Sequence, residues 1–181
     1  MEGKQMELFQ VSKYLDVEHT IAKYMFDPVE NPWEVLPSIS IFIEQLGPML
    51  PSEEFEQRGS NVWISKSAII APTAYIGGPC IIDAGTEVRH CAFIRGSAII
   101  GKNCVIGNST EVKNSIIFDE VQIPHYNYVG DSILGFRSHL GAGAITSNVK
   151  NDKSNVEVNF ALGKMDTKLR KFGAIIGDYS Q

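Results

Sequence analysis

The hydrophobic positions of this chain recur with a period of six. From Ile64 to Val112 an aliphatic residue stands at every sixth position without a gap. Its members are Ile64, Ile70, Ile76, Ile82, Val88, Ile94, Ile100, Ile106 and Val112. Small residues follow the first eight of these by four positions, at Ala68, Ala74, Cys80, Thr86, Ala92, Ala98, Cys104 and Thr110. Neither a helix, with its period of 3.6, nor an alternating strand requires such spacing.

This period predicts a chain that turns a corner every six residues and returns to the same inner edge. Three such units close one coil, so we predict a mainly β fold, a left-handed parallel β-helix of hexapeptide repeats with a short N-terminal helical segment. Successive coils should lie ~4.8 Å apart. The aliphatic residues would fill the interior, and the small residues would fit near corners that a larger side chain would overfill. The unbroken run argues against a β-sandwich with accidental periodicity.

Two steps in the later part of the series are one residue short. Ile117 follows Val112 after five residues, and Leu134 follows Val129 after five. A shortened unit draws one corner inward and re-aims the side chains near it, as a bulge does in a flat sheet. Irregularities in a regular scaffold often mark functional positions. We therefore expect the site near these two steps.

Residues 1–60 differ from the repeat region and are predicted to form a helical N-terminal cap. Asp16 precedes one apolar stripe, residues 31–34 (NPWE) open a second, and Gly47-Pro48 ends it. We expect this segment to pack on one end of the β-helix and shield its open edge. This structural role is preferred over a catalytic one, with a partner-docking surface as the alternative.

Residues 61–181 are assigned to the β-helix, with an interruption at residues 149–172. That stretch is polar and rich in lysine, and it contains a strand-like patch at residues 156–160. We interpret it as a loop excursion, with a hairpin as one form, that ends in a basic cluster. The cluster is either a solvated protrusion or a contact to a phosphate or a neighbouring subunit. The repeat resumes at residues 175–178, so the last coil is expected to be incomplete.

Charge and composition narrow the choice of partners. The formal net charge of −5 argues against a general nucleic-acid or anionic-membrane binder. No apolar run is long enough to span a bilayer, and the N-terminus lacks the apolar core of a signal peptide. The three cysteines form no CxxC pair. Cys80 and Cys104 occupy inward positions, whereas Cys91 is one position off and is expected to face solvent. We expect a cytoplasmic protein with no nucleic-acid or membrane partner.

Counting the units by threes places Arg95 directly above Lys113 on one wall in adjacent coils. Like charges stacked on neighbouring strands are unfavourable, but an anion between them would make them tolerable. A phosphate fits, because arginine binds it in a bidentate fork and lysine adds a point charge. The alternative is that both side chains extend into water.

His125 lies at a corner that leads into the same wall. Histidine is well suited to accept a proton near neutral pH, so we predict a catalytic role against the alternative of an ordinary surface histidine. Metal binding is the competing use, because His90 occupies the equivalent corner two coils away. Their strands would be ~9.6 Å apart, too far to share an ion with Zn–N distances of ~2.0–2.1 Å. No metal site is therefore predicted.

The stretch from Val112 to Asn148 contains the run HYNYVGDSILG. It resembles the acetyltransferase domain of the bifunctional glucosamine-1-phosphate N-acetyltransferase/UDP-N-acetylglucosamine pyrophosphorylase family, and especially the archaeal-type sugar-1-phosphate branch. The resemblance covers about residues 62–149 and returns at residues 175–178. It implies acetyl-CoA as acyl donor, a role in UDP-N-acetylglucosamine biosynthesis, and a homotrimer with sites between subunits. No Gly-rich LxAGxGTRM-type run is present, so no pyrophosphorylase activity is expected of this chain.

The resemblance also assigns roles to individual residues. It implies that His125 is the general base that takes a proton from the substrate amine and that Tyr128 contacts the sugar. Arg95 and Lys113 match the cations that hold the sugar phosphate, in agreement with the stacking argument. Asn148 matches an asparagine that contacts the substrate.

Three further positions follow from the same resemblance. Ala142 matches a residue that lines the active site, and we assign it to the acetyl-CoA side. His139 stands where bacterial members have a sugar-contacting asparagine. The family's downstream lysine corresponds to Lys171 or, alternatively, to Lys153.

The sequence thus predicts an acetyl-CoA-dependent N-acetyltransferase that acts on an amino-sugar 1-phosphate by direct attack, without a metal. One alternative is a non-catalytic sugar-phosphate-binding or scaffold protein, because the later coils that supply much of the family's acetyl-CoA site are expected beyond Gln181. Another is a hexapeptide acyltransferase for a different amine.

Overall fold

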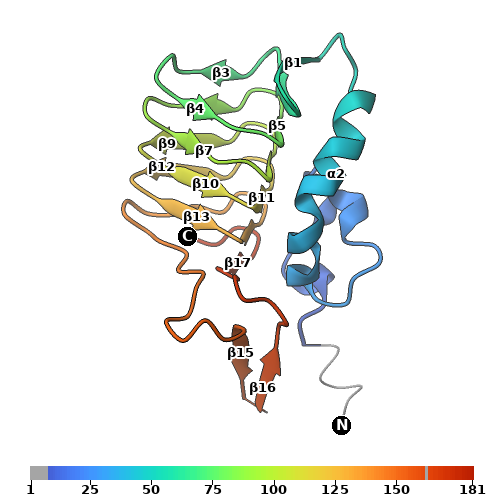
Figure 1. Cartoon of the computed structure of the whole chain (residues 1–181), viewed down its shortest axis with the longest axis vertical. Helices are drawn as coiled ribbons and strands as arrows, with labels where there is room; N and C mark the ends of the chain where they lie inside the picture. The colour runs from blue at the N-terminus through green and yellow to red at the C-terminus, as the bar shows by residue number, and fades with distance from the viewer. Residues whose placement is uncertain (1–7, 162) are drawn as a thin grey trace.

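The computed structural model describes residues 8–161 and 163–181. Its body is a parallel β-solenoid with three walls of short, stacked strands (Figure 1). The predicted mainly β fold of hexapeptide coils is confirmed. No helix in this part of the chain is long and apolar enough to cross a membrane.

The three walls, here called A, B and C, are separate sheets. Wall A has the order β1-β2-β5-β8-β11-β14-β17, wall B β12-β9-β6-β3, and wall C β13-β10-β7-β4. Wall A contains β1 (Phe55–Gly59), β2 (Val62–Ser65), β5 (Cys80–Ile82), β8 (Ala98–Ile100), β11 (Ser115–Ile117), β14 (Ile133–Leu134) and β17 (Ile175–Ile176). Wall B contains β3 (Ile69–Ile70), β6 (Glu87–Val88), β9 (Val105–Asn108) and β12 (Gln122–His125). Wall C contains β4 (Tyr75–Ile76), β7 (Phe93–Ile94), β10 (Glu111–Lys113) and β13 (Tyr128–Gly130).

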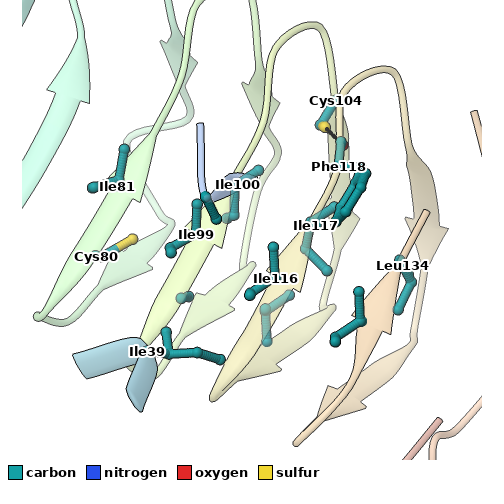
Figure 2. Packing of buried hydrophobic residues seen from close by; sticks show 14 of the residues in the cluster. Ile39, Cys80, Ile81, Ile99, Ile100, Cys104, Ile116, Ile117, Phe118 and Leu134 are labelled. Carbon is teal, nitrogen blue, oxygen red and sulfur yellow. Dashed lines mark hydrogen bonds between the residues drawn. The ribbon is translucent and has the colours of Figure 1, made fainter. Parts of the chain in front are cut away.

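The aliphatic series forms the interior of the solenoid. Ile100, Ile117 and Leu134 occupy matching positions on β8, β11 and β14 and are fully buried (Figure 2). The small residues Cys80 and Cys104 are also buried, and burial raises the pKa of both thiols to about 12. Both thiols therefore stay protonated and act as core side chains, as predicted.

The N-terminal segment consists mainly of short 3₁₀ helices. They are η1 (Val11–Lys13), η2 (Val17–His19), η3 (Lys23–Met25), η4 (Pro32–Ser38) and η5 (Gly47–Met49), with the α-helix α2 (Ile39–Leu46) between the last two. Asp16 caps η2 by accepting a hydrogen bond from the Glu18 amide at 3.1 Å. The first seven residues of the predicted cap lie outside the described residues.

Helix α2 of this segment lies along one wall of the solenoid, whereas the last strand of the segment covers an end. Helix α2 runs alongside wall A and contacts β5 and β8 (Figure 1). The reason is that wall A is apolar on both faces, because its outward residues Ile81, Ile99, Ile116 and Ile133 are also fully buried. The end of wall A is covered by β1, the last part of the predicted cap, which pairs antiparallel with β2.

The predicted interruption contains a β-hairpin. β15 (Glu157–Phe160) pairs antiparallel with β16 (Gly163–Asp166), and the hairpin protrudes from the body of the molecule (Figure 1). An antiparallel bridge between Val149 and Lys171 joins the two sides of the excursion near its base. The chain then rejoins wall A, where β17 pairs with β14.

Candidate functional site

Arg95 and Lys113 lie on neighbouring strands of wall C, because β7 and β10 pair in the predicted register. Each cation has its own carboxylate. Arg95 Nη1 is 2.7 Å from Glu111 Oε1, and Lys113 Nζ is 2.9 Å from Asp131 Oδ2. Each of the two stacked charges is therefore compensated within the protein by its own carboxylate. An anion bound between the two cations stays a prediction.

The two ion pairs differ in their exposure to solvent. In the Arg95–Glu111 pair, 46% and 29% of the side chains are exposed, compared with 19% and 4% for Lys113 and Asp131. The hydrogen bond that the Arg95 guanidinium donates to Glu111 raises the pKa of that guanidinium. Exposed pairs of this kind are weak, because water screens them. An incoming anion would therefore replace Glu111 at Arg95 more readily than Asp131 at Lys113.

Asp131 is a buried carboxylate at the corner between β13 and β14. It accepts hydrogen bonds from Lys113 Nζ, from Asn114 Nδ2 at 2.8 Å and from Asn148 Nδ2. Asn114 and Asp131 have positive φ angles of 45° and 50°, which Asn and Asp tolerate better than most residues. These are the two shortened corners, so the period slips coincide with the polar centre of the site.

Tyr128 and Asn148 extend this polar cluster over Gly130. Asn148 Nδ2 donates to the Tyr128 hydroxyl at 3.0 Å. A Cβ added at Gly130 would lie 2.5 Å from the Tyr128 oxygen and 2.8 Å from Asn148 Nδ2. The absence of a side chain at Gly130 therefore leaves the space in which the tyrosine reaches the asparagine.

His125 ends β12 and is exposed to solvent. Within residues 8–161 and 163–181 its ring makes no hydrogen bond, while its backbone N–H donates to Asn127 Oδ1 at 3.1 Å. The pairing of β12, β9 and β6 confirms that His90 is its counterpart two coils away. His125 ends a strand of wall B and lies five residues before Gly130, which pairs with Lys113 on wall C. The imidazole therefore comes from the corner that leads from wall B into wall C.

The structure places the remaining predicted residues as follows. The amide of Gly143 donates to the carbonyl of His125 at 3.1 Å, which brings the loop with Ala142 next to His125. His139 is exposed and forms a parallel bridge with Gln122, so it continues wall B.

The backbone of Lys171 lies beside the polar cluster, because Lys171 forms an antiparallel bridge with Val149. The amide of the next residue, Phe172, donates to the Asn148 carbonyl at 3.0 Å. Lys153 lies within the excursion, where its carbonyl accepts from Arg170 Nε at 3.2 Å. Of the two alternatives for the downstream lysine, Lys171 is therefore the one whose backbone is anchored beside the site.

Two cavities lie away from the strands of wall C. The larger, of about 970 Å³, lies between residues 10–17 of the N-terminal segment, residues near Phe26, and Asp178. The smaller, of about 470 Å³, is lined by Ser147 and residues 149–152 and so borders Asn148. Among the residues that the structure describes, no cluster of three His, Cys, Asp or Glu side chains could hold a metal ion. The candidate site is therefore a set of residues along an outer wall, beside a small cavity.

Comparison with known proteins confirms the resemblance seen in the sequence. The family model described as "GMPPB C-terminal domain" matches residues 76–165. The "Bifunctional protein GlmU" of Methanococcus maripaludis is 39% identical over 175 residues, which is 95% of this chain and 41% of that protein. A "Bifunctional sugar-1-phosphate nucleotidylyltransferase/acetyltransferase" of Sulfurisphaera tokodaii is 37% identical over 67 residues, covering 37% of this chain and 17% of that protein. The chain thus spans about two fifths of the length of the first of these relatives.

A solved structure, the acetyltransferase domain of PglB from Neisseria gonorrhoeae, matches with a TM-score of 0.45 and 16% identity. The match covers 46% of this chain and 42% of that one. A similarity this low adds nothing to the interpretation of the site.

Proposed function

Since nearly the whole chain is related in sequence to archaeal GlmU-type proteins, we propose that it transfers the acetyl group of acetyl-CoA to the amine of an amino-sugar 1-phosphate. The observation that supports this proposal is the placement of two basic side chains and a tyrosine–asparagine pair along wall C, with an exposed histidine at the corner that leads into it. These are the groups that an anion, a sugar and a reacting amine respectively need.

In the proposed reaction the sugar phosphate lies across wall C. Its phosphate replaces Glu111 at Arg95 and takes the remaining donors of Lys113. Tyr128 and Asn148 hold the sugar, and His125 accepts a proton from the ammonium group. The amine then attacks the thioester carbonyl, so that the C–N bond forms and the C–S bond breaks. The proton held by His125 passes to the departing thiolate, and the nitrogen releases its second proton to water, which gives the amide and the free CoA thiol.

A thiol-release assay tests this function. The full chain is incubated with acetyl-CoA and either glucosamine 1-phosphate or galactosamine 1-phosphate, and the CoA thiol is measured. Release with at least one of them, and none with the unphosphorylated sugars, is the expected result. Binding of the sugar phosphate without release would favour the alternative of a non-catalytic binding protein, and release with other amines alone would favour a different acyltransferase.

Arg95→Ala should raise the KM for the sugar phosphate about tenfold, because a charge-assisted bond to the phosphate is lost. Arg89→Ala is the matched control, since Arg89 Nη2 forms a similarly exposed pair with Glu87 at 3.1 Å. That pair lies on wall B, away from the proposed phosphate position. Equal KM values for wild type and Arg95→Ala would remove Arg95 from the site.

We also propose that the protein is a homotrimer. Large apolar side chains are exposed on the outer face of wall C, including Tyr75 at 62% and Ile145 at 68%. Exposed apolar side chains on one face favour contact with another chain. Light scattering should give three times the 20.0 kDa mass of one chain, and a monomeric mass would contradict the trimer.

A further inference from the structure

We propose that Asp131 is a positioning residue that fixes Lys113 and Asn148 for the sugar phosphate. This inference rests on the proposed function and adds a residue whose side chain does not itself touch the substrate. The side chain of Asp131 is only 4% exposed. A buried carboxylate is costly unless it is paired and fully hydrogen-bonded, so its three donors are held firmly around it.

The three donors come from successive coils at the same corner. Lys113 and Asn114 belong to the coil before Asp131, and Asn148 belongs to the coil after it. Lys113 Nζ lies 2.9 Å and Asn114 Nδ2 2.8 Å from the two carboxylate oxygens. Asp131 therefore ties neighbouring coils together at the place where the repeat is shortened.

Asp131 also sets the orientation of the Asn148 amide. A carboxylate only accepts hydrogen bonds, so the group that faces Asp131 must be the NH₂ of Asn148. The same NH₂ group donates to the Tyr128 hydroxyl. In the part of the chain that the structure describes, the side-chain oxygen Oδ1 of Asn148 has no donor. It is thus available as an acceptor for a sugar hydroxyl.

Lys113 is fixed in the same way. One of the three donors of its ammonium group is used by Asp131, which leaves two for a phosphate. Without Asp131, a lysine side chain would move among many rotamers. Asp131 therefore prepares both a cation and an acceptor before the substrate arrives, and this preorganisation lowers the cost of binding.

The test is Asp131→Asn in the full chain, with steady-state kinetics for glucosamine 1-phosphate and acetyl-CoA. The NH₂ group of the new Asn side chain would face N–H groups that donate to the carboxylate in the wild type, so the cluster must rearrange. The expected result is a KM for glucosamine 1-phosphate raised about tenfold or more, with the KM for acetyl-CoA unchanged. Combined with Lys113→Ala, the substitution should raise KM by less than the product of the two single effects.

Asp83→Asn is the matched control. Asp83 is equally buried, but its carboxylate accepts from the Ala84 amide on another corner. The Asp83→Asn substitution should leave the KM values for glucosamine 1-phosphate and acetyl-CoA unchanged. If Asp131→Asn does not fold, Asn114→Gly removes one donor while keeping the positive φ angle. This variant should raise the KM for glucosamine 1-phosphate about two- to fivefold.

The outcomes separate the two proposals. An active wild type whose Asp131→Asn variant has an unchanged KM overturns the positioning role and leaves the proposed function standing. An equal rise in the KM for glucosamine 1-phosphate and the KM for acetyl-CoA would also overturn the positioning role. The same holds if Asp83→Asn raises the KM for glucosamine 1-phosphate as much as Asp131→Asn does, because a purely structural role would produce either result. If Asn114→Gly folds and Asp131→Asn does not, an unchanged KM of Asn114→Gly for glucosamine 1-phosphate also overturns the positioning role. A folded wild type that releases no thiol with either amino-sugar phosphate overturns the proposed function, and the role of Asp131 falls with it.

Discussion

The His125→Ala variant is expected to lose about 10²- to 10⁴-fold in kcat, while its KM for the sugar phosphate changes little. The imidazole is the group assigned to take the proton from the attacking ammonium, and an ammonium has no lone pair with which to attack. The proposed phosphate ligands are Arg95 and Lys113 on wall C, so substrate binding is not expected to depend on His125. Thiol release with glucosamine 1-phosphate and acetyl-CoA measures both constants.

His90→Ala is the control for this substitution. His90 occupies the same corner of the solenoid two coils away, and it is also exposed. Its Nδ1 lies 2.9 Å from Thr73 Oγ1 rather than near the polar cluster. The His90→Ala variant should retain the kcat of the wild type. Equal activity of wild type and His125→Ala would show that His125 is not the general base.

Gly130→Ala should lower kcat/KM roughly 100-fold, because even a ~1 Å displacement of positioning groups can have an effect of this size. The new methyl group would occupy the space of the Tyr128 hydroxyl and the Asn148 amide. The tyrosine ring must therefore move, and its hydrogen bond to Asn148 is lost. The backbone at Gly130 does not have a positive φ angle, so the fold should survive the change. Kinetics and thermal unfolding of the same sample test both statements.

Gly77→Ala provides the matched comparison. Gly77 stands on wall C just after β4, as Gly130 ends β13, and a Cβ there would meet the Tyr75 ring at 3.3 Å and no atom closer. Its neighbours need to shift by only a few tenths of an ångström, and it lies three coils from Asp131. Its kcat/KM should stay close to that of wild type. A Gly130→Ala variant as active as Gly77→Ala would show that the position of Tyr128 does not matter.

The solenoid was predictable because its interior repeats one physical demand in every coil. Ile94 and Val112 could be paired by counting alone, and the structure has that register. The stacking of Arg95 above Lys113 follows from it. The shortened units were also visible in the sequence, as a step of five residues.

The packing of α2 along wall A was not predicted, because the interior series of hydrophobic residues carries no information on the outer faces. Ile81, Ile99 and Ile116 each stand next to a residue of wall A that faces the interior. Two adjacent apolar residues per strand indicate a sheet buried on both faces. This signal was present in the sequence, and it indicated that another segment lies along the wall.

The partners of the two cations were not predictable from spacing. Asp131 follows Lys113 by 18 residues, and Glu111 follows Arg95 by 16. Which carboxylate each cation reaches depends on side-chain rotamers and on burial, which a repeat does not fix. The sequence did contain one usable signal, since Asn114 and Asp131 are the polar residues at the shortened corners.

The central claim is that an amino-sugar phosphate lies across wall C, and a crystal structure of the protein with glucosamine 1-phosphate tests it most directly. We expect phosphate oxygens about 2.7–2.9 Å from the Arg95 guanidinium and the Lys113 ammonium. We also expect the sugar amine within about 2.6–3.2 Å of the His125 ring, or one water molecule away. A sugar phosphate bound elsewhere, with Arg95 still paired to Glu111, would contradict this claim.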